Sequence, residues 1–389
     1  MKPVGLVTCY FHHNYGSMLQ AYATEMIMEK LGIPFQTIAC KHPKDYMTGN
    51  RLLYAIKKVM IGDWKMWLGK KKIALASKKD KSFSANLKIR NAKFDEFCKE
   101  CFHVSELAPN RRALKDMSNN FSAFLVGSDQ LWRTDSVEHG YYTLDWVPDN
   151  VRKIAYSTSI GVKKIPWFQV KKNRKFMNRF DYVALREKSA CDIYRLITGK
   201  TAQVVLDPTL LFTGAEWMRI QGERPFTEGE YIFVYLLGDN PEQREYIKMV
   251  KERVGCKIVA LLHLDDYIPL DNGYADETPY HVGPKDFLNL IRNAKYVFTD
   301  SFHCSVFSIL YQKDFFTFSR FSERNRQSTN TRIDNLLHIV GLEERRWSID
   351  KPIESAISLK SDFSKVDERL HEMRSKSMDY LKSALSGLE

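Results

Sequence analysis

Short apolar runs rich in β-branched and aromatic residues alternate along this chain with segments of helical periodicity, and this alternation constrains the fold more than any other feature. Such runs occur at residues 3–9, 35–39, 122–126, 152–157, 182–185 and 203–206, and again at 231–237, 257–262, 296–299 and 315–318. Helical patterns separate them, as at 17–31, 91–100, 241–254, 285–293 and 304–311. Apolar strands alternating with helices are typical of a parallel sheet covered on both faces. The sequence therefore predicts an α/β fold.

The strand–helix series runs through the chain twice. A length of 389 residues exceeds what one ordinary core accommodates, and the rhythm restarts after the turn at 207–209. We therefore predict two Rossmann-like domains facing each other across a cleft. The first spans 1–210, with a basic helical insertion near 50–100, and the second spans 211–360. We expect the segment 361–389 to form a last helix, at about 364–386, that packs back on the first domain.

The chain is strongly basic, with a formal net charge of +12 and a pI of about 9.2, and such an excess indicates an anionic partner. Lysines are concentrated between residues 57 and 81, where Trp64, Met66, Trp67 and Ile73 are interleaved among them. Two interpretations stay open. The segment is either a helix lying on the anionic headgroups of the inner membrane or a solvated basic helix whose tryptophans pack on the body. No recognisable nucleic-acid module accompanies it, so nucleic acid is not the expected partner.

Cysteine usage and hydropathy bear on the compartment. Seven scattered cysteines, an odd number, argue against a disulfide framework and agree with a reducing environment. The sequence has neither a long apolar run nor a signal-peptide pattern, so we expect a cytoplasmic protein, peripheral to the membrane if the lysine-rich segment binds lipid. Cys98 and Cys101 with His103 form at most half a zinc site, and no metal is predicted.

Polar clusters follow several of the predicted strands, at the positions where ligands bind in open parallel sheets. These clusters contain Asn14, Gly16, Ser128, Asp129, Arg186 and Asp207 in the first half and Ser301, His303 and Arg320 in the second. Because the carboxyl ends of parallel strands meet at one edge of a sheet, we expect these residues to line a binding site.

Some of these residues also have a purely structural interpretation, which the sequence leaves open. Asn14 and Gly16 would equally serve as a tight turn and a helix cap, and Asp129 as the cap of a short helix. His303 is the strongest candidate because free N–H groups and the dipole at the start of its helix favour an anion. Among nearby aromatic residues, Tyr142 and Trp146 are expected in the core. Trp132 is left open between the core and a sugar-stacking role.

The clusters occur in an ordered set of longer motifs. These are NYGSMLQAYA at 14–23, VGSDQLW at 126–132, LREKSA at 185–190, VVLDPTLLF at 204–212, TDSFHCSVFSIL at 299–310 and NTRIDNLL at 330–337. Taken together and in this order, they resemble the polysaccharide pyruvyl transferase family. The resemblance implies two Rossmann-like domains similar to those of B-type glycosyltransferases. It also implies functional roles for the arginine of the RE motif, the histidine of the SFH motif and a basic residue near the end, which here are Arg186, His303 and Arg332.

The resemblance further implies a reaction. Pyruvate would move from phosphoenolpyruvate, the only co-substrate expected, onto a sugar of a bacterial cell-surface polysaccharide or its lipid-linked precursor, with formation of a ketal. Arginine pairs bidentately with carboxylate and phosphate, so Arg186, Arg332 and Arg320 are expected to hold the donor. His303 is expected to transfer a proton, because an ordinary imidazole has a pKa of about 6.5. Asp129 would accept the proton of the acceptor hydroxyl or orient the sugar.

Two positions depart from the family pattern, since Cys304 and Ala190 stand where the family commonly has glycine. Both residues are small, but a backbone with positive φ would suit them less well. Two alternatives to pyruvyl transfer share the expected architecture. One is a B-type glycosyltransferase that uses a nucleotide sugar, and the other is a non-catalytic relative that binds a glycan or a lipid.

Overall fold

The computed structural model describes residues 2–47, 75, 81–162, 164–263, 268–271, 273–320 and 331–388. The chain divides into two compact units. Unit 1 comprises Met1–Trp64, Cys98–Leu211 and His371–Glu389, and unit 2 comprises Lys65–Phe97 and Phe212–Leu370. Most of the lysine- and tryptophan-rich segment at 57–81 lies outside the described residues, so both interpretations of it stay open.

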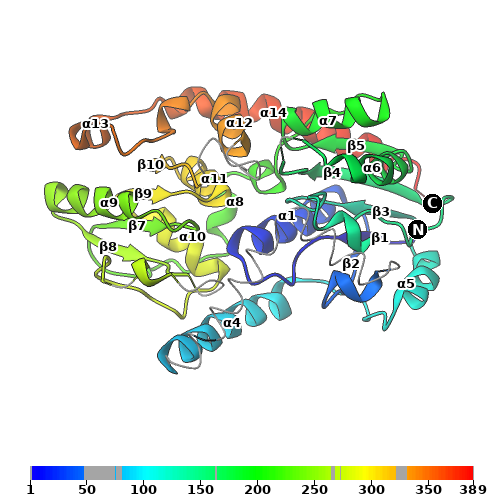
Figure 1. Cartoon of the computed structure of the whole chain (residues 1–389), viewed down its shortest axis with the longest axis horizontal. Helices are drawn as coiled ribbons and strands as arrows, with labels where there is room; N and C mark the ends of the chain where they lie inside the picture. The colour runs from blue at the N-terminus through cyan, green and yellow to red at the C-terminus, as the bar shows by residue number, and fades with distance from the viewer. Residues whose placement is uncertain are drawn as a thin grey trace. The chain divides into compact units, whose positions relative to one another are not determined.

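Within the described residues, unit 1 is built on a six-stranded sheet in the order β2-β1-β3-β4-β5-β6, with every neighbouring pair parallel (Figure 1). The strands are β1 (Val4–Val7), β2 (Phe35–Thr37), β3 (Ala123–Val126), β4 (Arg152–Thr158), β5 (Tyr182–Leu185) and β6 (Gln203–Val204). Because all of them run the same way, the loops that follow them emerge at one edge.

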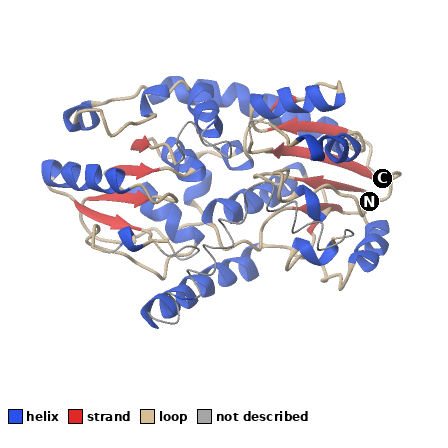
Figure 2. Cartoon of the chain, viewed as in Figure 1, coloured by secondary structure: helices blue, strands red, loops and turns tan. Residues whose placement is uncertain are grey.

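Helices cover both faces of this sheet (Figure 2). They are α1 (Tyr15–Leu31), α5 (Arg111–Met117), α6 (Val170–Met177), α7 (Lys188–Thr198) and the later part of α14 (Phe363–Leu385), with 3₁₀ turns η1 (Pro43–Tyr46), η2 (Ser118–Asn120), η3 (Val137–His139), η4 (Trp167–Gln169) and η5 (Pro208–Leu211). Phe124 and Val126 of β3 share one core with Phe176 of α6. On β4, Tyr156 instead stacks on Tyr380 of α14, with ring centroids 6.2 Å apart. This burial on both sides explains why the strands are apolar throughout.

Unit 2 repeats the arrangement on a smaller scale. Its described sheet has four parallel strands in the order β10-β9-β7-β8. They are β7 (Tyr231–Tyr235), β8 (Lys257–Ala260), β9 (Tyr296–Thr299) and β10 (Asp314–Thr317), accompanied by α8 (Gly214–Met218), α9 (Pro241–Val254), η6 (Pro269–Asp271), α10 (Pro284–Asn293), α11 (Phe302–Leu310), α12 (Thr331–Val340), η7 (Glu343–Arg345), α13 (Ile353–Ser358) and the first part of α14. Consecutive residues of β7 face opposite sides of the sheet. Val234 packs in a core with Ile247 of α9, whereas Phe233 contacts Phe287 of α10.

The predicted α/β class with two parallel, Rossmann-like sheets is confirmed. The chain passes between the units at Leu211–Phe212, beside the expected boundary at 210–211. The structure differs for the described part of the insertion, because residues 81–97 belong to unit 2 whereas the sequence assigned all of 50–100 to the first domain. The described part of that segment is the helix α4 (Lys81–Cys101). Its Arg90 donates a hydrogen bond of 2.7 Å to the carbonyl of Leu262 in unit 2.

The last helix, α14, returns to unit 1 as expected. Residues from His371 onward belong to unit 1, where Leu206 N–H donates to Ser377 Oγ of α14 over 3.0 Å. Trp132, like Tyr142 and Trp146, is buried, and its indole N–H donates to the Tyr142 carbonyl over 3.1 Å. All three are therefore core residues, and the sugar-stacking interpretation of Trp132 is wrong. None of the described helices is both long and apolar enough to cross a membrane.

Candidate active site

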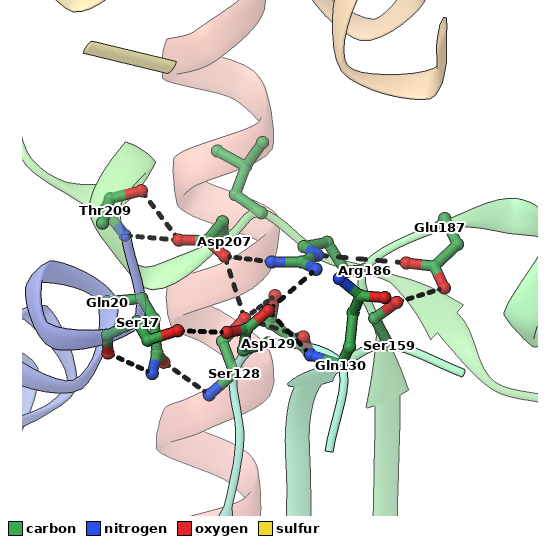
Figure 3. Close-up of polar contacts among 12 residues, drawn as sticks. Ser17, Gln20, Ser128, Asp129, Gln130, Ser159, Arg186, Glu187, Asp207 and Thr209 are labelled. Atoms are coloured by element: carbon green, nitrogen blue, oxygen red, sulfur yellow. Dashed lines mark hydrogen bonds and ion pairs between the residues drawn. The ribbon is translucent and has the colours of Figure 1, made fainter. Parts of the chain in front are cut away.

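The carboxyl-terminal edge of the six-stranded sheet carries a buried, charged cluster (Figure 3). Its centre is Arg186, which directly follows β5. The guanidinium Nη1 lies 2.8 Å from Oδ2 of Asp207, Nη2 lies 3.7 Å from Oδ1 of Asp129, and Nε lies 3.9 Å from Oε2 of Glu187. The loops after β3, β5 and the short β6 thus bring together residues that are far apart in the sequence, as the parallel topology predicts.

Arg186 is almost completely enclosed, with a side chain 3% exposed. Burial is the largest influence on its pKa and lowers it, but the charges of Asp207, Asp129 and Glu187 outweigh burial and leave the pKa above its ordinary value. The guanidinium is therefore permanently charged and already faces carboxylates. This environment differs from that expected for an arginine that clamps an anionic substrate.

Asp207 and Ser128 are enclosed with it. Asp207 Oδ2 also accepts a hydrogen bond from Ser128 Oγ over 2.9 Å, and its Oδ1 accepts from N and Oγ1 of Thr209 over 3.1 and 2.7 Å. The Ser128 amide donates to Gln20 Oε1 over 2.9 Å. The side chain of Asp207 is 0% exposed and Ser128 is 0% exposed, so both hold the loops in place. Neither occupies the substrate-facing position that the sequence suggested.

Asp129 is the most accessible acid of the cluster, with a side chain 17% exposed, against 3% for Glu187. Its backbone is left-handed, with φ 74°. Its Oδ2 accepts from Ser17 Oγ over 2.8 Å and lies 3.6 Å from the thiol of Cys9. Burial first, and then the charge of Asp129, raises the pKa of that thiol well above its ordinary value, so Cys9 is a neutral donor. Asp129 is thus a carboxylate oriented by donors on two sides.

The first strand contributes to this geometry through a helix cap. Asn14 is the N-cap of α1, and its side chain accepts from the Ser17 amide over 3.1 Å. Gly16 is buried in the first turn of the same helix. The capping interpretation of Asn14 is therefore confirmed. Its consequence for the site is indirect, because the capped turn presents Ser17 to Asp129.

The carboxyl-terminal edge of the sheet in unit 2 carries a histidine and arginines in place of a cluster of carboxylates around one arginine. Ser301 is the N-cap of α11, and its Oγ accepts from the Cys304 amide over 3.5 Å. His303 follows in the first turn, 6% exposed, with its ring 5.1 Å from that of Phe302. The guanidinium of Arg332 on α12 lies over the ring of the same Phe302, 5.8 Å from its centroid. One aromatic ring therefore contacts both a histidine and an arginine at a helix start.

Arg320, just after β10, completes the described part of this edge. Its Nε lies 3.6 Å from Oδ2 of Asp300, and its Nη2 donates to the Asp300 carbonyl over 3.3 Å. Asp300 also accepts from the Leu237 amide over 2.7 Å, which links the ends of β7, β9 and β10. Gly238 allows this approach, since a Cβ there would lie 3.0 Å from Asp300 Oδ2.

Comparison with protein families identifies the family of this chain. The model for polysaccharide pyruvyl transferase matches residues 14–322. The chain belongs to the polysaccharide pyruvyl transferase family. It is accordingly a transferase of the kind that acts on polysaccharide. The matched region includes Arg186, His303 and Arg320, whereas Arg332 lies beyond its end.

Solved structures add a likeness in fold alone. A protein from Listeria monocytogenes assigned as a UDP-N-acetylglucosamine 2-epimerase is 12% identical, with a TM-score of 0.53 over 100% of this chain and 98% of that one. Another UDP-N-acetylglucosamine 2-epimerase is 9% identical, with a TM-score of 0.53 over 99% and 96%. The glycosyltransferase SnogD from Streptomyces nogalater is 10% identical, with a TM-score of 0.42 over 99% of each chain. Comparison with curated proteins finds no match.

The two departures from the pyruvyl transferase pattern are accommodated without strain. Cys304 lies in α11 and Ala190 in α7, and both are buried. Neither is among the residues with positive φ, so the concern about a left-handed glycine position does not apply here. Burial raises the pKa of the Cys304 thiol to about 12, which keeps it neutral.

Sequence patterns did not reveal every polar residue at these edges. Ser17 and Glu187 were within the quoted motifs but had no role assigned. A further group in unit 2 was missed entirely: Arg244 Nη2 lies 2.6 Å from Oδ1 of Asp271, whose Oδ2 lies 2.7 Å from Nδ1 of His263. His263 directly follows the strand predicted at 257–262 and could have been found as the other clusters were, whereas Asp271 sits in the 3₁₀ turn η6 and no local signal pointed to it.

The described residues contain no group of three or more His, Cys, Asp or Glu placed to hold a metal ion. The Cys98, Cys101 and His103 trio does not form such a group, and His103 Nδ1 instead lies 2.9 Å from Glu25 Oε2. All seven cysteines are free thiols.

Proposed function

We propose that this transferase moves a pyruvyl group from phosphoenolpyruvate to two hydroxyls of a sugar, in a cell-surface polysaccharide or its lipid-linked precursor, and forms a ketal. The observation that carries the donor assignment is the gathering of His303 and Arg332 around Phe302 at the start of α11. Phosphoenolpyruvate carries a carboxylate and a phosphate, and both groups favour arginine forks and helix N-termini.

Unit 2 supplies the donor side in this proposal. Arg332 and Arg320 hold the two anionic groups, and N–H groups of the first turn of α11 add hydrogen bonds. Arg320 is 22% exposed and its Nε lies 3.6 Å from Asp300, a looser pairing than the 2.8 Å contact of Arg186. An incoming anion can compete for such a guanidinium. His303 lies in the same turn and is the acid that protonates the methylene carbon of the enol.

Unit 1 supplies the acceptor side. Its cluster is rich in carboxylates, which suits sugar hydroxyls and repels a free dianion. Asp129 is the general base in this proposal, because it is the most accessible acid of the cluster and Ser17 orients its carboxylate. Arg186 does not hold the donor in this scheme. It is a positioning residue that neutralises Asp207 and Glu187 and fixes the Asp129 loop.

The imidazolium of His303 gives a proton to C3 of the donor, and C2 becomes electrophilic. The first sugar hydroxyl bonds to C2 and passes its proton to Asp129. The C2–O bond to phosphate then breaks, and a second hydroxyl bonds to C2 and closes the ketal. Of the two hydroxyl protons, one replaces that given up by His303 and the other leaves with phosphate.

The experiment incubates the purified chain with phosphoenolpyruvate and a β-galactoside, free or lipid-linked, and measures phosphate release together with the mass of the sugar product. We expect phosphate release that depends on the acceptor. His303→Gln and Asp129→Asn should each lower kcat by about 10²–10⁴-fold with unchanged thermal unfolding.

The matched control is His338→Gln. His338 is on α12, its side chain is 82% exposed and it pairs with Glu343, so turnover should stay within about twofold of the wild type because no reacting group is touched. Turnover only with a nucleotide sugar would replace this proposal by a glycosyltransferase. Near-normal turnover of His303→Gln would remove the proposed acid.

A further inference from the structure

Two large apolar side chains of unit 1 stand out in solvent. Trp167 is 81% exposed and Leu196 is 82% exposed, the highest values among the large apolar side chains of the described residues. Trp167 lies in η4, and its only ring contact with a described residue is with the neighbouring Phe168, at 5.9 Å. Single exposed apolar residues are ordinary on protein surfaces, so the surroundings of these two decide their meaning.

Trp167 begins a continuous line on one helical face. The turn η4 runs directly into α6 at Val170, and residues four apart lie on the same side of a helix. Trp167, Lys171 and Lys175 are spaced in this way, and both lysines are exposed. The opposite side of α6 packs Phe176 and Met177 into the core. The face formed by Trp167, Lys171 and Lys175 is therefore held outward by the fold.

Leu196 is exposed near the end of the next helix, α7, which is tied to α6. Arg174 of α6 donates from Nε to the carbonyl of Ile197 over 2.8 Å, which ties the end of α7 to α6 beside Leu196. Arg195 and Lys200, on either side of Leu196, are exposed. We call this the α6–α7 face and define it by Trp167, Leu196, Lys171, Arg174 and Lys175.

Basic residues predominate on this face. Between residues 164 and 180 the sequence has six basic residues and no acidic one, whereas on α7 the exposed Asp192 stands one turn before Leu196, against exposed Arg195 and Lys200. Lys172 is paired with Glu138 at 3.2 Å and Arg179 with Asp149 at 2.8 Å. Lys164, Lys171 and Lys175, by contrast, make no ion pair with any other described residue. The face thus keeps uncompensated positive charge next to its exposed tryptophan and leucine.

We propose that the α6–α7 face docks this protein on a bilayer surface with anionic headgroups. An indole side chain flanked by lysines suits the boundary between headgroups and acyl chains, because the ring partitions there while the amines remain with the phosphates. The charge complementarity selects an anionic lipid surface. This inference does not depend on the transfer reaction, and it concerns described residues outside the segment at 57–81.

The test is co-sedimentation of the full-length chain with large vesicles of phosphatidylcholine alone or mixed with phosphatidylglycerol, at low salt. We expect binding to the mixed vesicles only. Lys171→Gln with Lys175→Gln should weaken binding about 25-fold, since each cation near an anionic surface contributes about fivefold. Trp167→Ser with Leu196→Ser should weaken it by at least about tenfold, through lost apolar insertion.

Matched controls lie in unit 2. Lys360→Gln with Lys365→Gln removes two lysines that are 76% and 74% exposed, and Met249→Ser removes an apolar side chain 42% exposed. These variants should bind within about twofold of the wild type, and unchanged thermal unfolding would show that every variant folds. The proposal is overturned if the wild type ignores anionic vesicles, or if both α6–α7 variants bind as it does. It is also overturned if only the lysine variant loses binding, because the face would then attract charge without inserting.

Discussion

Arg186→Met is the substitution that most directly separates a structural from a substrate-binding arginine. It leaves Asp207 without the cation that now lies 2.8 Å away, in a pair whose side chains are 3% and 0% exposed. Removing one partner of a buried ion pair costs roughly 3–5 kcal/mol. The hydrogen bonds that Asp207 accepts from Ser128 and Thr209 remain, which favours the lower end. The loss is still a large share of a typical stability of about 5–15 kcal/mol.

The assay is denaturant unfolding followed by circular dichroism, with hydrogen exchange of peptides from β5 and β6 to localise the loss. Adding Asp207→Asn should restore part of the stability, because the uncompensated charge is then gone. The control is Arg253→Met, whose partner Glu354 lies 3.8 Å away with both side chains more than half exposed, at 64% and 71%. That change should cost under about 1 kcal/mol. If Arg186→Met unfolds with a free energy within about 1 kcal/mol of the wild type, and Asp207→Asn rescues nothing, the carboxylate cluster does not depend on Arg186 and our reasoning fails.

Two further predictions concern backbone and pH. Gly127 has φ 141°, and a Cβ there would lie 1.9 Å from the Tyr156 carbonyl oxygen, so Gly127→Ala should lower the free energy of unfolding by at least about 2 kcal/mol. The control Gly199→Ala, at φ 76° with open space around it, should cost about 1 kcal/mol. Equal losses of stability in thermal unfolding would contradict this. Burial raises the pKa of Asp271, but the hydrogen bond and charge of His263 outweigh it and leave the pKa below its ordinary value. The stability that this carboxylate adds is therefore present above about pH 4 and lost as pH falls further, so the unfolding free energies of Asp271→Asn and wild type should converge in acid and diverge near neutrality.

Much of the fold could be predicted because its signal is local. Each strand is buried on both sides and so reads as an apolar run. The end of β6 shows the limit of this approach. The apolar run extends to 206, but the strand ends at Val204, because the Leu206 amide bonds to Ser377 of α14. A partner 171 positions away leaves no mark on the run itself.

The candidate site was predictable in its location and not in its electrostatics. The polar residues after the strands do lie at the strand edges, because parallel topology requires it. The partners of Arg186 depend on which strands are neighbours, and no local pattern encodes that β3 and β6 flank β4 and β5. An arginine after an apolar strand therefore looked like an anion clamp, whereas its surroundings are carboxylates.

The same surroundings change how an inactive Arg186 variant should be interpreted. Loss of turnover in Arg186→Met would follow equally from a missing substrate contact and from a displaced Asp129 loop, so activity alone cannot assign a role. Arg186→Lys separates the two. It keeps the positive charge that Asp207 requires but cannot reach Asp129, Glu187 and Asp207 at once, because a lysine amine is a point charge and not a planar fork. A stable Arg186→Lys variant with low kcat and an unchanged KM for phosphoenolpyruvate is the result that positioning predicts. A raised KM for that donor with normal kcat would instead place Arg186 against the substrate.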